Sequence, residues 1–265
     1  MQNPPRWVST SGDLERPNAA RLYDYYLGGA HNFAVDREFA EHTMKLVPTA
    51  ALVQHSRAFL RRAVQACLAA GIRQFLDLGS GIPTAGNVHE VAHRVDPTCR
   101  VVYVDNEPAT VAHARTMLRD NPCVAFAEAD VRDPEAVLGS PEVRTVLDLD
   151  RPIAVLMVAI LPYVRDEDRP VELVAAYRDA VVTGSHLVLS HLTADYRPEV
   201  AEALMHVAAE TQSPVVARAR AAIEPLLKGF DLLEPGLVPV TEWRAEEEPS
   251  AGDETVSYGA VGVKR

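Results

Sequence analysis

Short apolar runs of the β type alternate with helical patterns between residues 72 and 192, and this alternation restricts the fold more than any other feature of the sequence. Strands that are separated by crossover helices imply a parallel sheet with right-handed connections. The fourth run, Ile153–Ile160, is apolar at every position, which suits a central strand that is buried on both faces. The expected strands are Ile72–Leu78, Arg100–Val104, Cys123–Ala127, Ile153–Ile160 and His186–His191, with helices over Thr84–Val95, Pro108–Arg119, Pro134–Leu138, Glu142–Leu147 and Arg169–Val182.

The C-terminal residues predict an antiparallel edge for this sheet. Ser213-Pro214 has the form of a helix start, with an N-cap before a proline, and this helix is expected to run to Lys228. Two strands are expected at about Asp231–Trp243 and Glu254–Val263, on either side of an acidic loop, and they are typical of a hairpin. The predicted fold class is therefore α/β: a Rossmann-like, seven-stranded, mostly parallel sheet with helices on both faces, a C-terminal antiparallel hairpin and an N-terminal helical extension.

Residues 1–70 predict a polar leader followed by helices that cannot bury their apolar faces alone. Helices are expected over Asn18–Leu27 and Asp36–Leu46, and a longer one from Pro48 to Gly71. We expect them to pack across the domain at 71–265 and to share its core. The tyrosine-rich stretch before Gly28-Gly29 is interpreted as part of a lid, with the glycines as its hinge.

Composition excludes several functional classes. The formal net charge is −11, so the chain lacks the overall basic charge expected of a protein that holds nucleic acid non-specifically, and a local basic patch stays open. A small-molecule or protein substrate is favoured over nucleic acid. Cys67, Cys99 and Cys123 have no zinc spacing, which predicts buried thiols and no metal. No apolar run is long enough to cross a bilayer, and the N-terminus lacks a secretory signal, so no membrane association and a cytoplasmic location are expected. The oligomeric state stays open.

The segment Asp77-Leu78-Gly79-Ser80-Gly81 joins the end of the first predicted strand to the next helix. Ligands of open α/β sheets bind outside the carboxyl ends of the strands, and glycines let the backbone approach a ligand closely. A dinucleotide-binding loop would have a third glycine at position 84, where this chain has Thr84. The loop therefore indicates a nucleoside-containing ligand and weakens the NAD interpretation.

Acidic residues follow the next two predicted strands. Asp105 comes 24 residues after Gly81, at the place where an acidic side chain accepts hydrogen bonds from ribose hydroxyls. The alternative is that Asp105 only caps the helix near Pro108. Asp130 follows the third strand, from where its carboxylate can reach the exocyclic amine of an adenine. The alternative is that Asp130 caps the next helix, but Asp133 is already well placed to cap that helix at Pro134, which leaves Asp130 free for a ligand.

These motifs together resemble the class I methyltransferases that use S-adenosylmethionine (SAM). The resemblance is closest to one family, the S-adenosyl methyltransferase family, which was first described as a domain of unknown function, and it extends over nearly the whole chain from Arg16. It is carried by Arg21-Leu22-Tyr23-Asp24-Tyr25-Tyr26-Leu27-Gly28-Gly29-Ala30-His31-Asn32-Phe33 with Asp36, by Gly79-Ser80-Gly81-Ile82-Pro83-Thr84, by Val102-Tyr103-Val104-Asp105-Asn106-Glu107-Pro108, and by Glu234-Pro235-Gly236-Leu237-Val238.

The resemblance implies SAM as cofactor and a role for each matching residue. Gly79, Ser80 and Gly81 would face the methionine part of SAM, and Asp77 would help to hold its amino group. Asp105 would bind the ribose and Asn106 would flank the adenine. The remaining implied contacts are the adenine edge for Asp130 and Val131, and the underside of the methionine part for Ala159.

The sequence defines the site of the methyl acceptor less clearly than it defines the cofactor site. After the fourth strand the chain has Ala159-Ile160-Leu161-Pro162-Tyr163, which lacks the polar group that enzymes methylating base amines carry there, and this argues against N-methylation of bases. Methyl transfer needs mainly a nucleophile held in line, and a general base only if the acceptor arrives protonated. Tyr26, His31 and His191 are the candidate catalytic residues, and Tyr23, Asp36 and Asp195 are further candidates for a base or positioning role.

Three functions stay open at this stage. The first is a SAM-dependent methyltransferase with an unidentified, small-molecule acceptor. The second is a non-catalytic sensor or interaction protein that binds SAM. The third, an NAD(P)-dependent oxidoreductase, is disfavoured by Thr84.

Overall fold

The computed structural model describes residues 16–83, 86–211, 213–246 and 255–265. The polar leader before Arg16, Thr84 and most of the acidic loop at 244–253 therefore lie outside the described residues. No helix in the described part of the chain is both long and apolar enough to span a bilayer. Cys67 and Cys99 are buried and Cys123 is partly exposed, and all three are free thiols.

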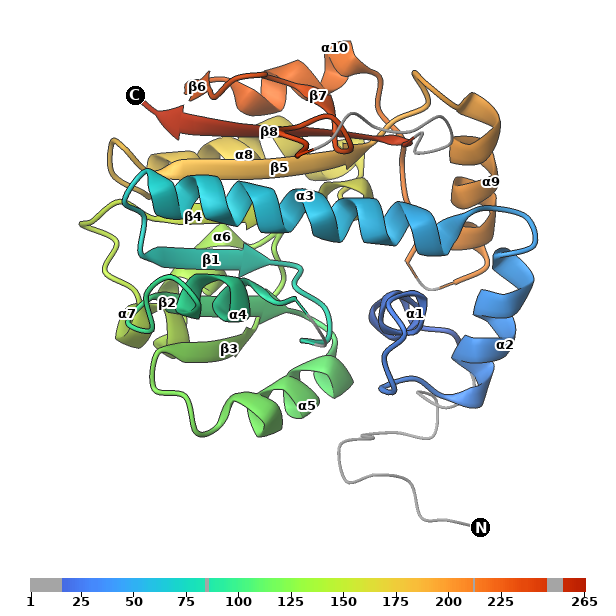
Figure 1. Cartoon of the computed structure of the whole chain (residues 1–265), viewed down its shortest axis with the longest axis horizontal. Coiled ribbons are helices and arrows are strands. Elements are labelled where there is room, and N and C mark those ends of the chain that lie inside the picture. The colour runs from blue at the N-terminus through green and yellow to red at the C-terminus, as the bar shows by residue number, and fades with distance from the viewer. Residues whose placement is uncertain (1–15, 84–85, 212, 247–254) are drawn as a thin grey trace.

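A mixed sheet forms the centre of the molecule (Figure 1), and it confirms the predicted Rossmann-like class. Parallel strands β3, β2, β1, β4 and β5 lie side by side in that order, and β8 then pairs antiparallel with β5 on one side and with β6 on the other. Their bounds are β1 Gln74–Leu78, β2 Arg100–Asp105, β3 Val124–Glu128, β4 Ala154–Met157, β5 His186–Leu192, β6 Phe230–Leu232, β7 Val238–Pro239 and β8 Ser257–Lys264.

The predicted count of seven strands needs one correction, because the sheet formed by the described residues has eight. The expected strand Asp231–Trp243 is interrupted by a turn in which the Gly236 amide donates to the Leu233 carbonyl at 2.8 Å. Gly236 has a φ of +90°, a conformation that a regular strand does not contain. Two short strands, β6 and β7, therefore pair with β8 in place of one long strand.

Helices cover both faces of the sheet and bury two separate apolar layers. Alternate strand residues point to opposite faces, so Phe75 of β1 joins one layer and Leu76 joins the other. The Phe75 layer packs against α3 (Thr49–Ala69), α4 (Val88–His93) and α5 (Pro108–Leu118). The Leu76 layer packs against α6 (Pro134–Gly139), α7 (Pro141–Val146), α8 (Pro170–Asp179) and α10 (Arg220–Ile223).

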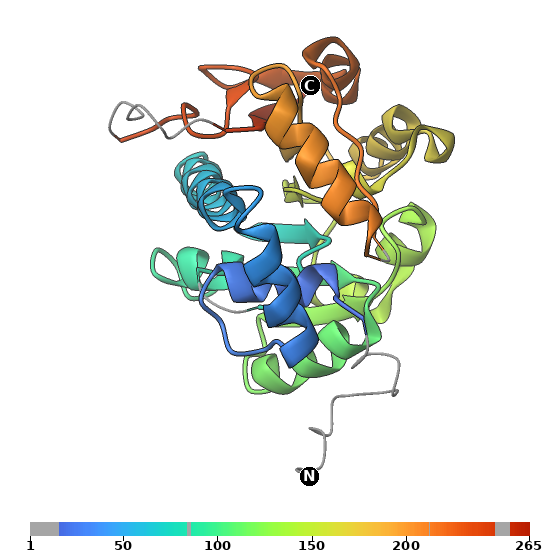
Figure 2. The same cartoon turned by 90° about the vertical axis from the view of Figure 1, so that its right-hand side faces the viewer.

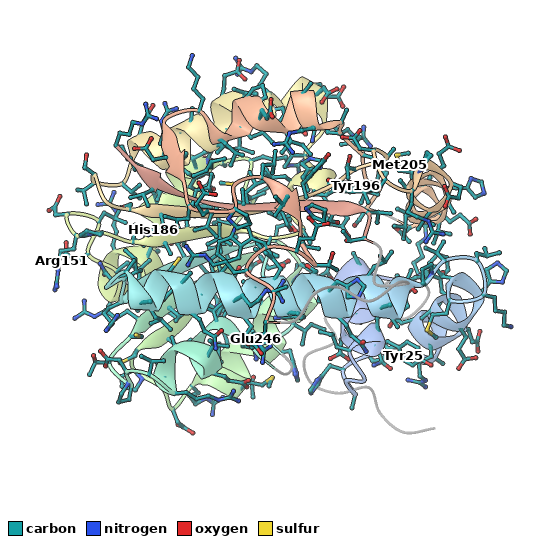
Figure 3. All side chains as sticks on the ribbon, turned by 45° about the horizontal axis from the view of Figure 1, so that its top comes forward. Tyr25, Arg151, His186, Tyr196, Met205 and Glu246 are labelled. Atoms are coloured by element: carbon teal, nitrogen blue, oxygen red, sulfur yellow. The ribbon has the colours of Figure 1, made fainter. Side chains whose placement is uncertain are left out.

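Further helices gather at the carboxyl end of the parallel strands. They are α1 (Ala19–Tyr26), α2 (Ala34–Thr43) and α9 (Pro198–Ala209), and Figure 2 views the molecule from this end, with α1 and α2 below α9. In Figure 3, Tyr25 and Met205 mark α1 and α9 at this end, whereas Arg151 and His186 mark the opposite end, where β4 and β5 begin. The helical extension is therefore placed where a sheet of this class binds its ligand.

The helix predicted from Ser213-Pro214 to Lys228 is wrong over its first half, because residues 213–219 contain no helix. The Val216 amide donates to the Pro162 carbonyl at 2.8 Å, and the Arg218 amide donates to the Leu192 carbonyl at 3.0 Å. These bonds to other segments replace the bonds that a helix would make. Helix α10 begins only at Arg220 and continues as the 3-10 helix η4 (Glu224–Leu227).

Candidate functional site

A cavity of about 720 Å³ opens at the carboxyl ends of β1 to β5, beneath α1, α2 and α9. It is the point at which loops after several parallel strands meet helices from both ends of the chain. The structure brings every predicted cofactor residue to its wall: Asp77, Gly79, Ser80, Gly81, Asp105, Asn106, Asp130, Val131 and Ala159.

The glycine turn after β1 forms one edge of the cavity. The amides of Gly79 and Ser80 both donate to the Val104 carbonyl, at 2.8 and 3.1 Å, which ties the turn to the end of β2. Gly79 has a φ of +69°, and a Cβ atom there would overlap the side chain of Ile160. Glycine is thus required at this position both for its backbone conformation and for the close approach of the segment after β4.

Asp105 connects the first two loops. Its carboxylate accepts from the Gly81 amide at 2.9 Å and from the Glu107 amide at 3.0 Å, while it also lines the cavity. Burial raises the pKa of Asp105, and the amide hydrogen bonds oppose that rise. Helix α5 has Glu107 as its N-cap, so Asp105 is not the cap itself. A carboxylate has about four lone-pair directions, which leaves acceptor capacity facing the cavity.

Asp77 lies at the end of β1 and is buried. Burial raises the pKa of its carboxyl to about 7, an effect that the positive charge of Arg57 opposes and that Asp105 reinforces. A buried carboxyl of this kind is stabilised when a cation binds beside it, because the cation favours its charged form. The position therefore suits an ammonium group.

Asp130 and Val131 are fixed by their own partners. Arg132 donates to the Asp130 carboxylate at 2.6 Å through Nη2 and lowers its pKa, and Asn106 donates to it at 3.4 Å. The hydroxyl of Tyr177 donates to the Val131 carbonyl at 2.8 Å. Asp133 accepts from the Ala136 amide at 3.0 Å, which confirms that it caps α6.

The chain after β4 turns sharply into the cavity. The expected strand Ile153–Ile160 ends at Met157, because Ala159 has a φ of +59°, outside the range of a strand. The Ala159 amide donates to the Ser190 hydroxyl of β5 at 2.9 Å, which holds this strained turn in place. Both residues line the cavity.

A second part of the cavity, which we call the acceptor arm, lies between the helices and is mainly apolar. Helices α1, α2 and α9 and residues 213–215 contribute no Asp, Glu, Lys, Arg or His to the described cavity wall. Helix α3 contributes a single charged residue, Arg57. The arm is lined by Tyr26, Phe39, Thr43, Thr49, Leu52, Val53, Leu192, Leu204, Val207, Val215 and Val256.

Much of the N-terminal motif maintains the shape of the helical extension. Arg21 and Asp36 form a buried ion pair at 2.7 Å, and Asp36 also accepts from the amides of Asn18 and Phe33. Asp24 accepts from the His31 amide at 2.7 Å and from the Asn32 side chain at 2.9 Å. The motif thereby fixes α1 against α2 and presents Tyr23 and Tyr26 to the cavity.

The candidate catalytic residues are placed very differently. Tyr26 lines the cavity, and burial raises its pKa. His31 lies outside this cavity, with its ring centroid 4.1 Å from that of His113. Of the further candidates, Tyr23 lines the cavity, Asp36 is held in the Arg21 ion pair, and Asp195 accepts from the Tyr258 hydroxyl at 3.1 Å.

The geometry does not favour the prediction that His191 acts as a general base. Its ring is fully buried, with Nδ1 at 2.8 Å from the Leu192 carbonyl and Nε2 at 2.8 Å from the Arg218 guanidinium. Because the carbonyl can only accept and the guanidinium can only donate, the ring is neutral with its proton on Nδ1. Burial lowers the pKa of His191 to about 4, which agrees with a structural role.

Sequence patterns gave no indication of two residues at the site. Arg57 is one of several α3 residues that face the cavity at helical spacing, and only packing shows which face that is. Ser190 lies in the all-buried strand β5, where its hydroxyl is paired with Ala159. Among the described residues, no group of three His, Cys, Asp or Glu side chains could hold a metal ion.

A solved structure of low sequence identity shares the fold of this chain. The structure superimposes on that of the N-methyltransferase NodS from Bradyrhizobium japonicum, solved with S-adenosylhomocysteine, with a TM-score of 0.50 over 92% of this chain and 98% of that one, at 15% identity. At that identity the likeness shows the fold alone, a Rossmann-like sheet with helices on both faces. A search of curated proteins gave no match.

Two solved structures are much more similar. A DUF574 family protein from Streptomyces avermitilis is 35% identical, with a TM-score of 0.90 over 96% of this chain and 99% of that one. An inferred methyltransferase from Thermobifida fusca is 37% identical, with a TM-score of 0.91 over 98% and 100%. The family model described as S-adenosyl methyltransferase matches residues 5–265. The chain therefore belongs to the S-adenosyl methyltransferase family, whose cofactor is SAM, and this agrees with the SAM interpretation over NAD(P).

Proposed function

We propose that this protein transfers the methyl group of SAM to an uncharged small molecule that occupies the acceptor arm. The observation that carries the proposal is one continuous cavity whose wall joins the carboxylates and the glycine turn after β1 to β3, the charged residues Arg132, Arg165, Glu167 and Asp168, and the uncharged side chains of the acceptor arm. Apolar surface with a few hydroxyls suits an uncharged ligand, because a charged one would lose its hydration there without a partner.

The cofactor end fits SAM in its donors and acceptors. We assign the adenine edge to Asp130 and Val131 after β3, the ribose to Asp105 at the end of β2, and the methionine part to Gly79, Ser80 and Gly81 after β1. The assignment is supported by the order of these strands, which are neighbours in the sheet as β3, β2 and β1. The carboxylate of Asp77 would accept from the α-ammonium group. Ala159 would lie beneath the methionine part, and Asn106 beside the adenine.

When bound, SAM supplies a methyl group on a positively charged sulfur, and the residues of this chain hold the acceptor in line with it. No histidine lines the described cavity wall, so the proposal depends on positioning and on exclusion of water more than on proton abstraction. Tyr26 contributes a hydroxyl to the acceptor arm, where it would orient the acceptor by a hydrogen bond. His31 and His191 would act on the fold and not on the acceptor.

Calorimetric titration followed by label transfer tests this proposal. We expect the purified protein to bind SAM and not NAD. We then expect methyl label from SAM to appear in the uncharged fraction of a metabolite extract and not in its anionic or cationic fractions. Failure to bind SAM would contradict the cofactor assignment, whereas binding without transfer to any fraction would favour the sensor function.

A further inference from the structure

Arg57 is the one charged side chain that α3 contributes to the cavity, and its positive charge acts on Asp77 at the end of β1. Its guanidinium carbon is 5.3 Å from the centre of the Tyr23 ring, which orients the group without neutralising it. The Nε atom is buried and has no hydrogen-bond partner among the described residues.

An unpaired buried donor of this kind is costly. Leaving a charged donor without an acceptor costs more than leaving a neutral one, so such groups in folded proteins normally have a partner. The planar guanidinium matches the geometry of a carboxylate, to which it can donate two parallel hydrogen bonds. The arrangement therefore points to an anionic ligand group that the protein itself does not provide.

The carboxylate of Asp77, close to Arg57, indicates which kind of ligand the two residues could bind together. Asp77, at the end of β1, is close enough that Arg57 lowers its pKa against the effect of burial, and Asp105 is the other charge acting on it. A cationic donor and an anionic acceptor at one end of a cavity are complementary to a zwitterion. An α-amino acid carries both charges on one carbon atom, and the methionine part of SAM ends in that group.

We propose that Arg57 binds the α-carboxylate of SAM while Asp77 accepts from its α-ammonium group, so that the two side chains together recognise the amino-acid end of the cofactor. This inference rests on the proposed function, because it requires SAM in this cavity. Arg57 is then a binding residue for the cofactor and leaves the acceptor arm without a charged group. The alternative, an anionic acceptor bound by Arg57, is an outcome of the test.

The test compares SAM with decarboxylated SAM, which has the same ribose, adenine and sulfonium but lacks the carboxylate. Binding is measured by calorimetry on the full chain. The variant Arg57→Gln should lower the affinity for SAM about 10- to 100-fold, the range expected for a hydrogen-bonded charge pair. It should change the affinity for decarboxylated SAM less than about 3-fold, because that ligand has no group for Arg57 to bind.

Arg61→Gln is the matched control, since Arg61 is on the same helix and half-exposed, with Glu246 at 3.9 Å. It should leave both affinities unchanged. If Arg57→Gln lowered the affinity for both ligands equally, Arg57 would have a purely structural role. If it lowered neither affinity, Arg57 would instead bind an anionic acceptor. Each result overturns the inference. Absence of SAM binding by the wild-type protein would instead contradict the proposed function itself.

Discussion

The two ends of the cavity are built in different ways. At the cofactor end, short turns after β1, β2 and β3 place backbone amides and carboxylates, and Asp105 is held by two amides. In the acceptor arm, side chains from α2, α3, α9 and residues 213–215 meet, although they are far apart in the sequence. The first end is specified by local motifs and the second by packing, so we expect substitutions at the two ends to have separable effects.

The Arg21–Asp36 ion pair supports the helical extension, and its loss should give the largest effect. Arg21→Met would leave the Asp36 carboxylate buried without its counter-charge, which costs about 3–5 kcal/mol. Amide hydrogen exchange should then show much faster exchange in residues 19–43 than in the sheet. Arg37→Met, which removes only exposed hydrogen bonds to Asn32, is the control and should have little effect. Unchanged protection of residues 19–43 in Arg21→Met would contradict the structural role of the motif.

At the cofactor end, Asp105→Ala should lower SAM affinity about 100-fold, because two charge-assisted hydrogen bonds to ribose hydroxyls would be lost. The matched control is Asp133→Ala, which removes the cap of α6 at a cost of about 1 kcal/mol in stability and should leave SAM affinity unchanged. Calorimetry measures both. Equal SAM affinities of the wild type and Asp105→Ala would contradict the assignment of Asp105 to the ribose.

In the acceptor arm, Leu204→Asp should reduce methyl transfer to the uncharged fraction at least about 10-fold, because a carboxylate there would be desolvated without a partner. SAM affinity should stay within about 2-fold of wild type. Leu204→Met keeps the side chain apolar and of similar volume, so it should retain activity. If Leu204→Asp weakened SAM binding as much as transfer, the two ends would not be separable.

The pH dependence of SAM binding should be the smallest effect. The pKa of Asp77 is raised to about 7, so its carboxylate forms mainly above that pH, and SAM affinity should rise at most about 8-fold between pH 6 and 7.5. Arg57 and Asp105 are the charged groups acting on Asp77, and the α-amino group of SAM itself loses its proton near about pH 8, which ends the rise.

The raised pKa of Asp77 also affects the stability of the protein without ligand, which falls as pH rises, whereas SAM affinity increases. Because folding raises this carboxyl pKa above its usual value, Asp77 makes the fold less stable as pH rises from about 4 to about 7. Asp77→Asn should remove both the rise in affinity and this decline in stability. A rise in affinity that persists in Asp77→Asn would assign it to another group.

The comparison also explains how far the sequence could predict the structure. The alternation of strands and helices, the glycine turn, Asp105 and Asp130 follow from local patterns, because each pattern needs only neighbouring residues to define its geometry. Arg57 could not be found in this way, since the orientation of α3 depends on its packing against the sheet. The helix predicted at Ser213 failed because hydrogen bonds from Val216 and Arg218 to other segments outweigh a favourable cap.

His191 is a second case in which the sequence alone could not show a contact between distant residues. A histidine at the end of a strand in this fold is a reasonable candidate base, but the sequence does not show that Arg218, 27 residues later, occupies its second nitrogen. Candidate site residues could therefore be predicted where they lie on local backbone turns, and could not be predicted where side chains from distant parts of the sequence meet.

The most direct test of the account is a crystal structure of the protein with S-adenosylhomocysteine. We predict ribose hydroxyls within hydrogen-bond distance of the Asp105 carboxylate, adenine beside Asp130 and Val131, and the sulfur facing the acceptor arm that Tyr26 lines. A ligand bound elsewhere, or with its ribose away from Asp105 and its sulfur closed off from the acceptor arm, would contradict the account.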